Sequence, residues 1–213
     1  METFSATGAV QAGWERFKQR PWFFVGVTVI IGVISGISGQ LTGHFDPSGP
    51  QAAALFGVML VGTAIGMVVG LLVKMGTISL YLKAYDNVGS AKFEDLWAPR
   101  HIVSFVLASI VVGIIIFLGF ILLIVPGIIW ALRYAFVQYL VIDRGLDVSA
   151  ALKESARITS GHKWQLLGFF LLLVLVNILG AICLIVGLLI SVPVSALATV
   201  HAYRTLSRMA PAA

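Results

Sequence analysis

Apolar residues occur in long runs along this chain, and short stretches of glycine, proline or charge separate the runs. A helix that spans a bilayer needs about 20 mostly apolar residues, and residues 22–40 and 53–73 each reach that length. The apolar stretches 102–142 and 164–205 are too long for one span, and each contains glycines near its middle that permit a turn. The pattern therefore predicts six membrane-spanning helices arranged as three helical hairpins.

Short segments with mixed polar and apolar positions precede the hairpins. Gly13, Trp14 and Phe17 fall on one helical face, and a later segment begins behind Asp147 or Ser149 as an N-cap. Such helices either lie in the headgroup plane or pack on the bundle, and the pattern is compatible with both. We predict one all-α, polytopic membrane domain over residues 1–213, with these parts: an amphipathic helix at 1–21, hairpin 1 at 22–89, a short cytoplasmic interfacial helix with hairpin 2 at 90–146, and another with hairpin 3 at 147–213.

The second and third hairpins resemble each other in sequence. Residues 118–125 match residues 179–186 at six of eight positions, an offset of 61. The same offset aligns His101 with His162, each just before an apolar stretch. We therefore expect an internal repeat of three units, each a short cytoplasmic helix followed by a hairpin.

The composition agrees with a protein in lipid. The chain is 59% hydrophobic and 11% charged, whereas a soluble domain carries about 25% charged residues on its surface. Soluble enzymes, disulfide scaffolds and disordered proteins are excluded on this ground. The single cysteine, Cys183, also excludes an intramolecular disulfide and a CxxC metal or redox site.

The positions of the charges predict the orientation. None of the 14 lysines and arginines falls in the loops expected on the outer side, as the positive-inside rule requires. Both termini are then cytoplasmic, and the first span is expected to remain uncleaved. The net charge of +5 is a topology signal with a secondary attraction to membrane lipids, and a nucleic-acid partner is not expected.

One basic residue falls inside a predicted span. Arg133 lies about 10 Å along the helix from Pro126 at 1.5 Å per residue, at a cost of roughly 2.5–3.5 kcal/mol in hydrocarbon, and no Asp or Glu occurs in any predicted span. One hypothesis is that Arg133, with Lys74, Tyr134 and Gln138, binds a phosphate headgroup or small anion in a cavity open to the cytoplasm. The alternative is a structural role, in which Arg133 bonds to helix-end carbonyls, Tyr134 or Gln138.

Glycines recur at helical spacing in the first two spans. Gly62, Gly66 and Gly70 form a GxxxGxxxG row, and Gly32 and Gly36 lie four apart in the preceding span. Small residues allow transmembrane helices to approach closely, so we expect these glycines to pack the first two spans together. A groove for a lipid chain or for a second protomer is the other interpretation.

Catalysis and metal binding are not expected. Residues 36–39 read GxSG, the nucleophile motif of rhomboid proteases, but Ser38 and His201 are predicted on opposite sides of the membrane. A nucleophile and its base must lie within about 3.2 Å. His101 and His162 lack further ligands nearby, so we predict no enzyme activity, no metal and no cofactor.

Several motifs together resemble a known group of proteins. They are VPGIIWALRYAF at residues 125–136, Asp143, AALKES at residues 150–155, and AYR at residues 202–204. These resemble a prokaryotic group of six-span membrane proteins of unassigned function, which includes the YciC-like proteins and the membrane domain of some glycerophosphodiester phosphodiesterases. The resemblance implies the prokaryotic cytoplasmic (inner) membrane and a connection to lipids or glycerophosphodiesters, and it supplies no catalytic residues.

The leading functional prediction is a non-enzymatic membrane protein that binds or transports an amphipathic or anionic ligand such as a phospholipid. The alternative is an accessory or scaffold subunit that docks another membrane protein or a second copy of itself.

Overall fold

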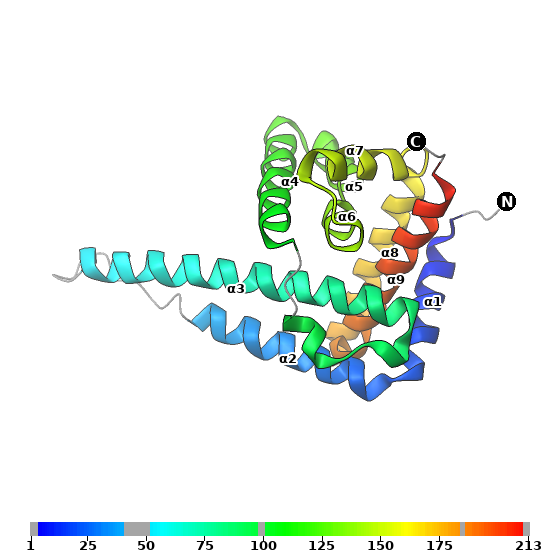
Figure 1. The fold of residues 1–213 in the computed structure, drawn as a ribbon, viewed down its shortest axis with the longest axis horizontal. Coiled ribbons are helices and arrows are strands. Elements are labelled where there is room, and N and C mark those ends of the chain that lie inside the picture. Colours follow the sequence, from blue (N-terminus) through cyan, green and yellow to red (C-terminus); the bar gives the residue numbers. More distant parts are fainter. Residues whose placement is uncertain (1–3, 41–51, 98–100, 184–185, 211–213) are drawn as a thin grey trace.

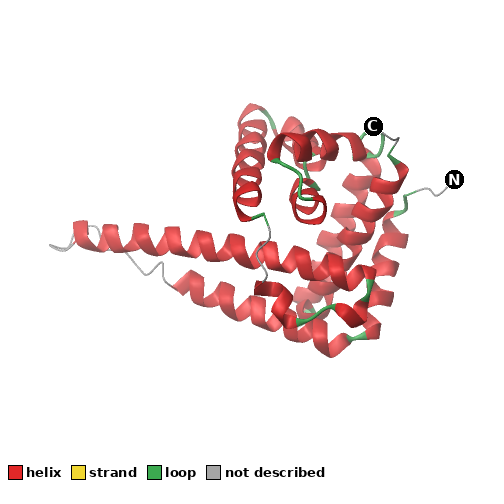
Figure 2. Ribbon diagram, viewed as in Figure 1, coloured by secondary structure: helices red, strands yellow, loops and turns green. Residues whose placement is uncertain are grey.

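The computed structural model describes residues 4–40, 52–97, 101–183 and 186–210. Within these residues the chain is helical and contains no strand (Figure 2), which confirms the predicted all-α class. In chain order the elements are α1 (Ala6–Gln19), α2 (Pro21–Gln40), α3 (Ala52–Asp86), the 3-10 helices η1 (Val88–Ser90) and η2 (Phe93–Trp97), α4 (Ile102–Leu122), α5 (Ile124–Arg133), α6 (Val137–Arg144), α7 (Val148–Ile158), α8 (Lys163–Ile182) and α9 (Leu188–Met209).

Several helices are long and apolar enough to cross a membrane, which indicates a multi-pass membrane protein. In the described residues there are four: Leu60–Asp86, Ile102–Leu122, Ile124–Arg144 and Lys163–Ile182. A fifth is possible if Ala6–Gln19 and Pro21–Gly36, which meet at a bend of 101°, form one broken span. The sequence predicted six spans, so this criterion identifies fewer than expected.

The helix α9 was expected to be a span, and it makes contacts with several other helices. It packs against α1, α2, α3 and α8 (Figure 1), and Leu197, Val200, Tyr203 and Leu206 on it are fully buried. Where helices pack on one another, polar side chains can hydrogen-bond across the contact, as Ser191 and Ser195 of α9 do with Asn177 of α8. This explains why α9 accommodates polar residues and does not qualify as a span on composition.

The helix α1, expected to be interfacial, packs along α9. A Cβ at Gly13 would lie 2.6 Å from the carbonyl oxygen of Val194 and 2.9 Å from the amide nitrogen of Ala198. Ala9 and Phe17 are buried on the same face, whereas Trp14 is 42% exposed. The sequence left open whether this helix lies in the headgroup plane or packs on the bundle. The face that carries Ala9, Gly13 and Phe17 packs on the bundle.

Pairs of glycines lie where the backbones of neighbouring helices come closest in two of the helix–helix contacts. A Cβ at Gly119 of α4 would lie 2.9 Å from the Cα of Gly127 on α5, and a Cβ at Gly187, just before α9, would lie 2.7 Å from the Cα of Gly180 on α8. Gly119 and Gly180 are equivalent in the expected repeat. In both contacts a side chain at either position would force the helices apart.

The helices α2 and α3 lie side by side and cross the layer formed by α1, α8 and α9 (Figure 1). Where an interfacial α-helix was expected before hairpin 2, the chain forms η1 and η2, which return along α3. An ion pair joins Asp95 of η2 to Lys83 of α3. Burial opposes ionisation of Asp95, but hydrogen bonds from the Lys83 ammonium and the Lys92 amide outweigh it and lower the pKa of this carboxyl.

Gly76 provides a test of this packing, because its Cβ would overlap the Leu96 carbonyl group, 2.6 Å from the carbonyl carbon. Gly76→Ala should lower the free energy of unfolding by about 1–3 kcal/mol, as overpacking does. The measurement is the midpoint of thermal unfolding of the purified protein in detergent. Gly70→Ala on the same helix is the control, since no neighbouring atom lies within 4 Å of its Cβ position. That control should be neutral or stabilising by about 0.5–1 kcal/mol, and equal effects of the two substitutions would contradict the packing.

Candidate functional site

Arg133 lies where a helix breaks, although the sequence suggested a continuous span through it. The helix α5 ends at Arg133, and α6 begins at Val137 after a short turn. The Arg133 carbonyl oxygen accepts hydrogen bonds from the hydroxyl groups of Ser155 (2.8 Å) and Thr159 (3.4 Å), which come from α7 and its C-terminal end. A helix end leaves backbone carbonyls without intrahelical partners, so these hydroxyls attach α7 to the end of α5.

The helix α7 is held in place by a cap and an ion-pair network. The Asp147 carboxylate accepts from the Ser149 amide (3.2 Å) as the N-cap. Glu154 pairs with Arg144 at 2.8 Å and with Arg157 at 2.7 Å. The hydrogen bond from Arg157 is the main cause of a lowered Glu154 pKa, and it outweighs the opposing effect of burial.

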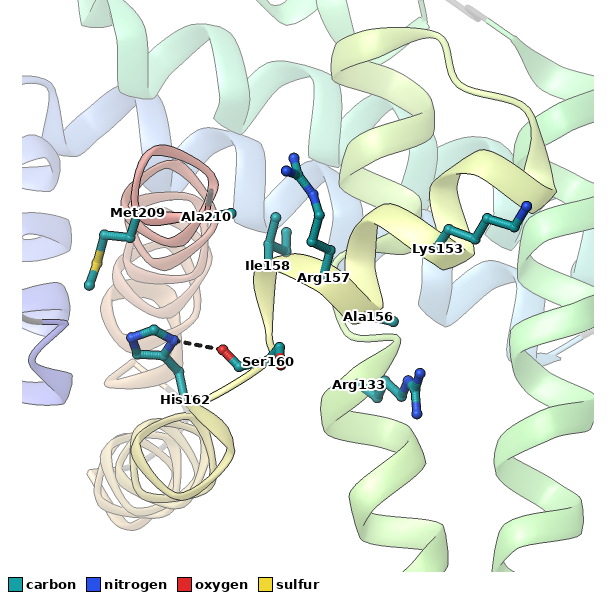
Figure 3. Close-up of a pocket in the computed structure, with 9 residues that line it drawn as sticks. All are labelled: Arg133, Lys153, Ala156, Arg157, Ile158, Ser160, His162, Met209 and Ala210. Carbon is teal, nitrogen blue, oxygen red and sulfur yellow. Dashed lines mark hydrogen bonds between the residues drawn. The ribbon is translucent and has the colours of Figure 1, made fainter. Parts of the chain in front are cut away.

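Basic side chains from three elements line one cavity of about 500 Å³, here called the α7 cavity (Figure 3). Its lining residues are Arg133, Lys153, Ala156, Arg157, Ile158, Ser160, His162, Met209 and Ala210. No carboxylate is among the described residues that line it. The volume falls in the range of about 300–1,000 Å³ that is usual for small-molecule sites.

The cations of the α7 cavity differ in their partners. Arg133 and Lys153 are exposed, and neither forms an ion pair within the described part of the chain. Arg157 is paired with Glu154, and His162 Nδ1 lies 3.1 Å from the Ser160 carbonyl oxygen. In Figure 3, Arg133 and Lys153 extend on one side of Ser160, and His162 lies on the other. The cavity therefore offers at least two cationic groups that an anion could bind.

The residues selected from the sequence separate in the structure. The Arg133 guanidinium carbon lies 5.9 Å from the centroid of the Tyr134 ring, so these two stay together. Gln138 instead donates to the Ser109 hydroxyl (3.0 Å) and joins α6 to α4. Lys74 is exposed on α3 and is not among the residues that line the α7 cavity.

Three basic residues of the cavity were missed in the sequence. Lys153 and Arg157 are four residues apart on the predicted interfacial helix, so they share a face, and His162 follows shortly after. That spacing could have been recognised in the sequence. The proximity of these three residues to Arg133 could not have been recognised, because it depends on the break after α5.

Three of the five glycines predicted to pack the first two spans together lie on open surface. Gly32, Gly36 and Gly70 have no other atom within 4 Å of a Cβ position, whereas Gly62 and Gly66 are half-buried on α3. At Gly32, Gly36 and Gly70, therefore, no close contact joins α2 to α3.

A second polar cluster, also missed, joins the ends of three helices. Arg204 of α9 donates to Asp143 of α6 and to Asp86 of α3, both at 2.7 Å. The Tyr203 hydroxyl donates to the same Asp143 oxygen at 2.7 Å. No partner was predicted for Arg204 from the sequence, although an acidic residue at the end of each of two predicted hairpin segments was a visible clue.

The histidines offer no metal site in the described part of the chain, where no group of three or more His, Cys, Asp or Glu side chains could hold an ion. His201 instead interacts through Nδ1 with the Tyr85 hydroxyl at 2.7 Å.

Comparisons with known proteins find distant relatives of uncharacterized function. The chain is 23% identical over 225 residues to Uncharacterized protein Rv2560 of Mycobacterium tuberculosis, an alignment that covers 96% of this chain and 69% of the relative. Uncharacterized protein Mb2590 of Mycobacterium bovis aligns with the same identity and coverage. No family profile matches the chain, and no solved structure matches it. The likeness agrees with a group of unassigned function, and the YciC-like resemblance is not confirmed.

The Arg204 cluster predicts unequal effects of two similar substitutions. Asp143→Asn should lower the free energy of unfolding by about 2–5 kcal/mol, because the Asp143 side chain is 16% exposed and its loss leaves a poorly hydrated arginine. Asp86→Asn should cost about 1 kcal/mol or less, since Asp86 is 55% exposed. Denaturant titration in detergent measures both values, and a larger effect at Asp86 would contradict the arrangement.

Proposed function

We propose that this chain is a non-enzymatic integral membrane protein that binds or transports an anionic amphiphile, such as a phospholipid, with the ligand's headgroup in the α7 cavity. The observation that carries the proposal is that Arg133, Lys153, Arg157 and His162 line one cavity whose described lining contains no carboxylate. These residues come from α5, from α7 and from the start of α8, so the cluster exists only in the folded chain.

The chemistry of these groups favours a phosphate. A guanidinium presents a planar set of donors that matches phosphate oxygens, and hydrogen bonds between ions are about twice as strong as neutral ones. Glu154 is shared by Arg144 and Arg157, so it leaves the charges of Arg133 and Lys153 without compensation. A lipid phosphate would supply the missing countercharge.

The surroundings support a location at the membrane surface. Trp164, two residues after His162, is 84% exposed, and tryptophan is enriched where the bilayer meets water. We propose that this level is the cytoplasmic face of a prokaryotic inner membrane and that both termini are cytoplasmic. The lysines and arginines on the predicted inner loops support that orientation.

We further propose that α2 and α9 complete six spans in three hairpins. The glycine contacts that close α4 against α5 and α8 against α9 support the hairpins and the repeat. The contacts of α9 with several other helices explain why composition alone does not identify it.

A second candidate function, an accessory or scaffold subunit, is favoured by a different observation. Gly32, Gly36 and Gly70 are open on α2 and α3, and Val33, Met67 and Val68 beside them are exposed apolar side chains. A helix of another membrane protein, or of a second copy, could approach these glycines closely.

The primary test of ligand binding replaces Arg133 with glutamine. Losing a charge-assisted hydrogen bond worth about 1.5–3 kcal/mol should weaken binding of phosphatidylglycerol about 10- to 100-fold. The readout is native mass spectrometry of detergent-purified protein titrated with phosphatidylglycerol and, separately, with phosphatidylcholine. Lys18→Gln removes the same charge from an exposed pair with Glu15 and should leave binding unchanged. Equal binding of both lipids by the wild type, or equal effects of the two substitutions, would argue against the headgroup site.

The scaffold candidate predicts a different result. Gly36→Ile and Gly70→Ile should abolish stoichiometric association with a partner or a second copy, because a branched side chain blocks close approach of helices. Chemical crosslinking in membranes followed by purification would measure it, with Gly168→Ile on α8, also open, as the control. Monomeric wild-type protein without a co-purifying partner would count against this candidate.

A further inference from the structure

An apolar groove of about 340 Å³, here called the α5–α8 groove, runs between these two helices. It is lined by Val125, Ile128, Ile129, Leu132, Lys163, Trp164 and Leu167. The four residues from α5 follow the i, i+3, i+4, i+7 spacing of a single helical face. From Leu132 to Val125 that face extends about 10 Å at 1.5 Å per residue.

The α5–α8 groove and the α7 cavity have no lining residue in common, but consecutive residues of the chain line the two of them. On α5, Leu132 lines the groove and the next residue, Arg133, lines the cavity. On the other wall, Lys163 lines the groove and the preceding residue, His162, lines the cavity. On both sides, therefore, an apolar lining residue and a basic lining residue are consecutive in the chain.

The order of chemistry along these walls matches that of a phospholipid. Arg133 and His162 lie at the charged end, and Lys163 and the exposed Trp164 mark the level at which headgroups meet hydrocarbon. Ile129, Ile128 and Val125 then continue the wall away from the charges. An acyl chain attached to a phosphate in the cavity would lie along this apolar face.

A second apolar hollow serves as the comparison. It is lined by Gly168, Leu171, Leu172, Val174, Leu175 and Ile178 of α8, and its volume is about 490 Å³. No basic residue lines it in the described chain. A hollow of this kind can hold hydrocarbon but has no means to select an anionic lipid.

We infer that the α5–α8 groove is the acyl-chain subsite of the ligand whose phosphate occupies the α7 cavity. This inference rests on the proposed function and makes it more specific: the ligand is a membrane phospholipid with an anionic headgroup, bound by one chain as well as by its phosphate. A water-soluble phosphate would use the cavity and leave the groove empty.

The test fills the groove and compares long-chain with short-chain ligands. Ile129 is 39% exposed, so Ile129→Trp can place its ring in the groove without entering the core. The purified full-length protein is titrated in detergent with dioleoyl-phosphatidylglycerol, dihexanoyl-phosphatidylglycerol and glycerol 3-phosphate. We expect the wild type to bind the dioleoyl lipid at least about tenfold more tightly than the dihexanoyl lipid. Ile129→Trp should reduce that preference to about twofold and leave binding of glycerol 3-phosphate unchanged.

Two further variants keep the result interpretable. Val125→Trp fills the far end of the same groove and should reproduce the loss of preference, which guards against a local folding defect at Ile129. Leu175→Trp fills the hollow without cations and should leave the preference intact.

The possible outcomes separate the inference from the proposed function. If Arg133→Gln weakens anionic lipid binding but neither groove variant alters chain-length preference, the acyl-chain subsite is wrong and the headgroup site stands. If Leu175→Trp has the same effect as Ile129→Trp, the preference reflects general hydrocarbon contact and the subsite is again wrong. If the wild type binds neither the lipids nor glycerol 3-phosphate, the proposed function itself fails.

Discussion

The guanidinium of Arg204, held between Asp143 and Asp86, is the interaction on which the arrangement of the other helices depends. It joins α9, α6 and α3, whose contacting residues are separated by 61 and 118 positions in the chain. In a poorly hydrated region an arginine without its partners is strongly destabilising, so the ends of these three helices must lie at one level. Asp143 is the penultimate residue of α6. The position of Asp143 therefore also determines the position of the nearby Gly145, which adopts a φ of 64°, and of the start of α7 that follows it.

The break after Arg133 lies beside a second contact with α9. Phe136, at the end of the break, and Tyr139 of α6 both pack their rings near Tyr203. The Tyr203 ring lies 5.9 Å from Phe136 and 5.7 Å from Tyr139. The turn leaves the Arg133 carbonyl without a helical partner, and hydroxyl groups of α7 replace that partner. The α7 cavity is thus the space between a broken span and the helix that caps the break.

These dependencies explain which features could be predicted from the sequence. The helices α4 and α8 are long, apolar and mostly exposed, so their length and apolar composition identified them directly. The N-cap of α7 was predictable to within Asp147 or Ser149, because a short-range side-chain bond determines it, and it is Asp147. The break after Arg133 was not predictable, because no proline or glycine marks residues 134–136. The grouping of Arg133 with Lys153, Arg157 and His162 was not predictable either, because it depends on how α7 packs against the end of α5.

The consecutive lining residues of the cavity and the groove also bear on what kind of ligand the proposed site would select. Exposed cations such as Arg133 and Lys153 contribute little individually to binding a free ion in water, because solvent and salt screen them. An apolar groove alone attracts any hydrocarbon, at about 25 cal/mol per Å² of buried surface, and does not distinguish one lipid from another. When Arg133 directly follows Leu132 on one wall and His162 directly precedes Lys163 on the other, a ligand gains both contributions only if its anion and its chain are covalently joined. The proposed site would therefore select a ligand in which the two are joined, which favours an anionic amphiphile over a soluble phosphate or a neutral lipid.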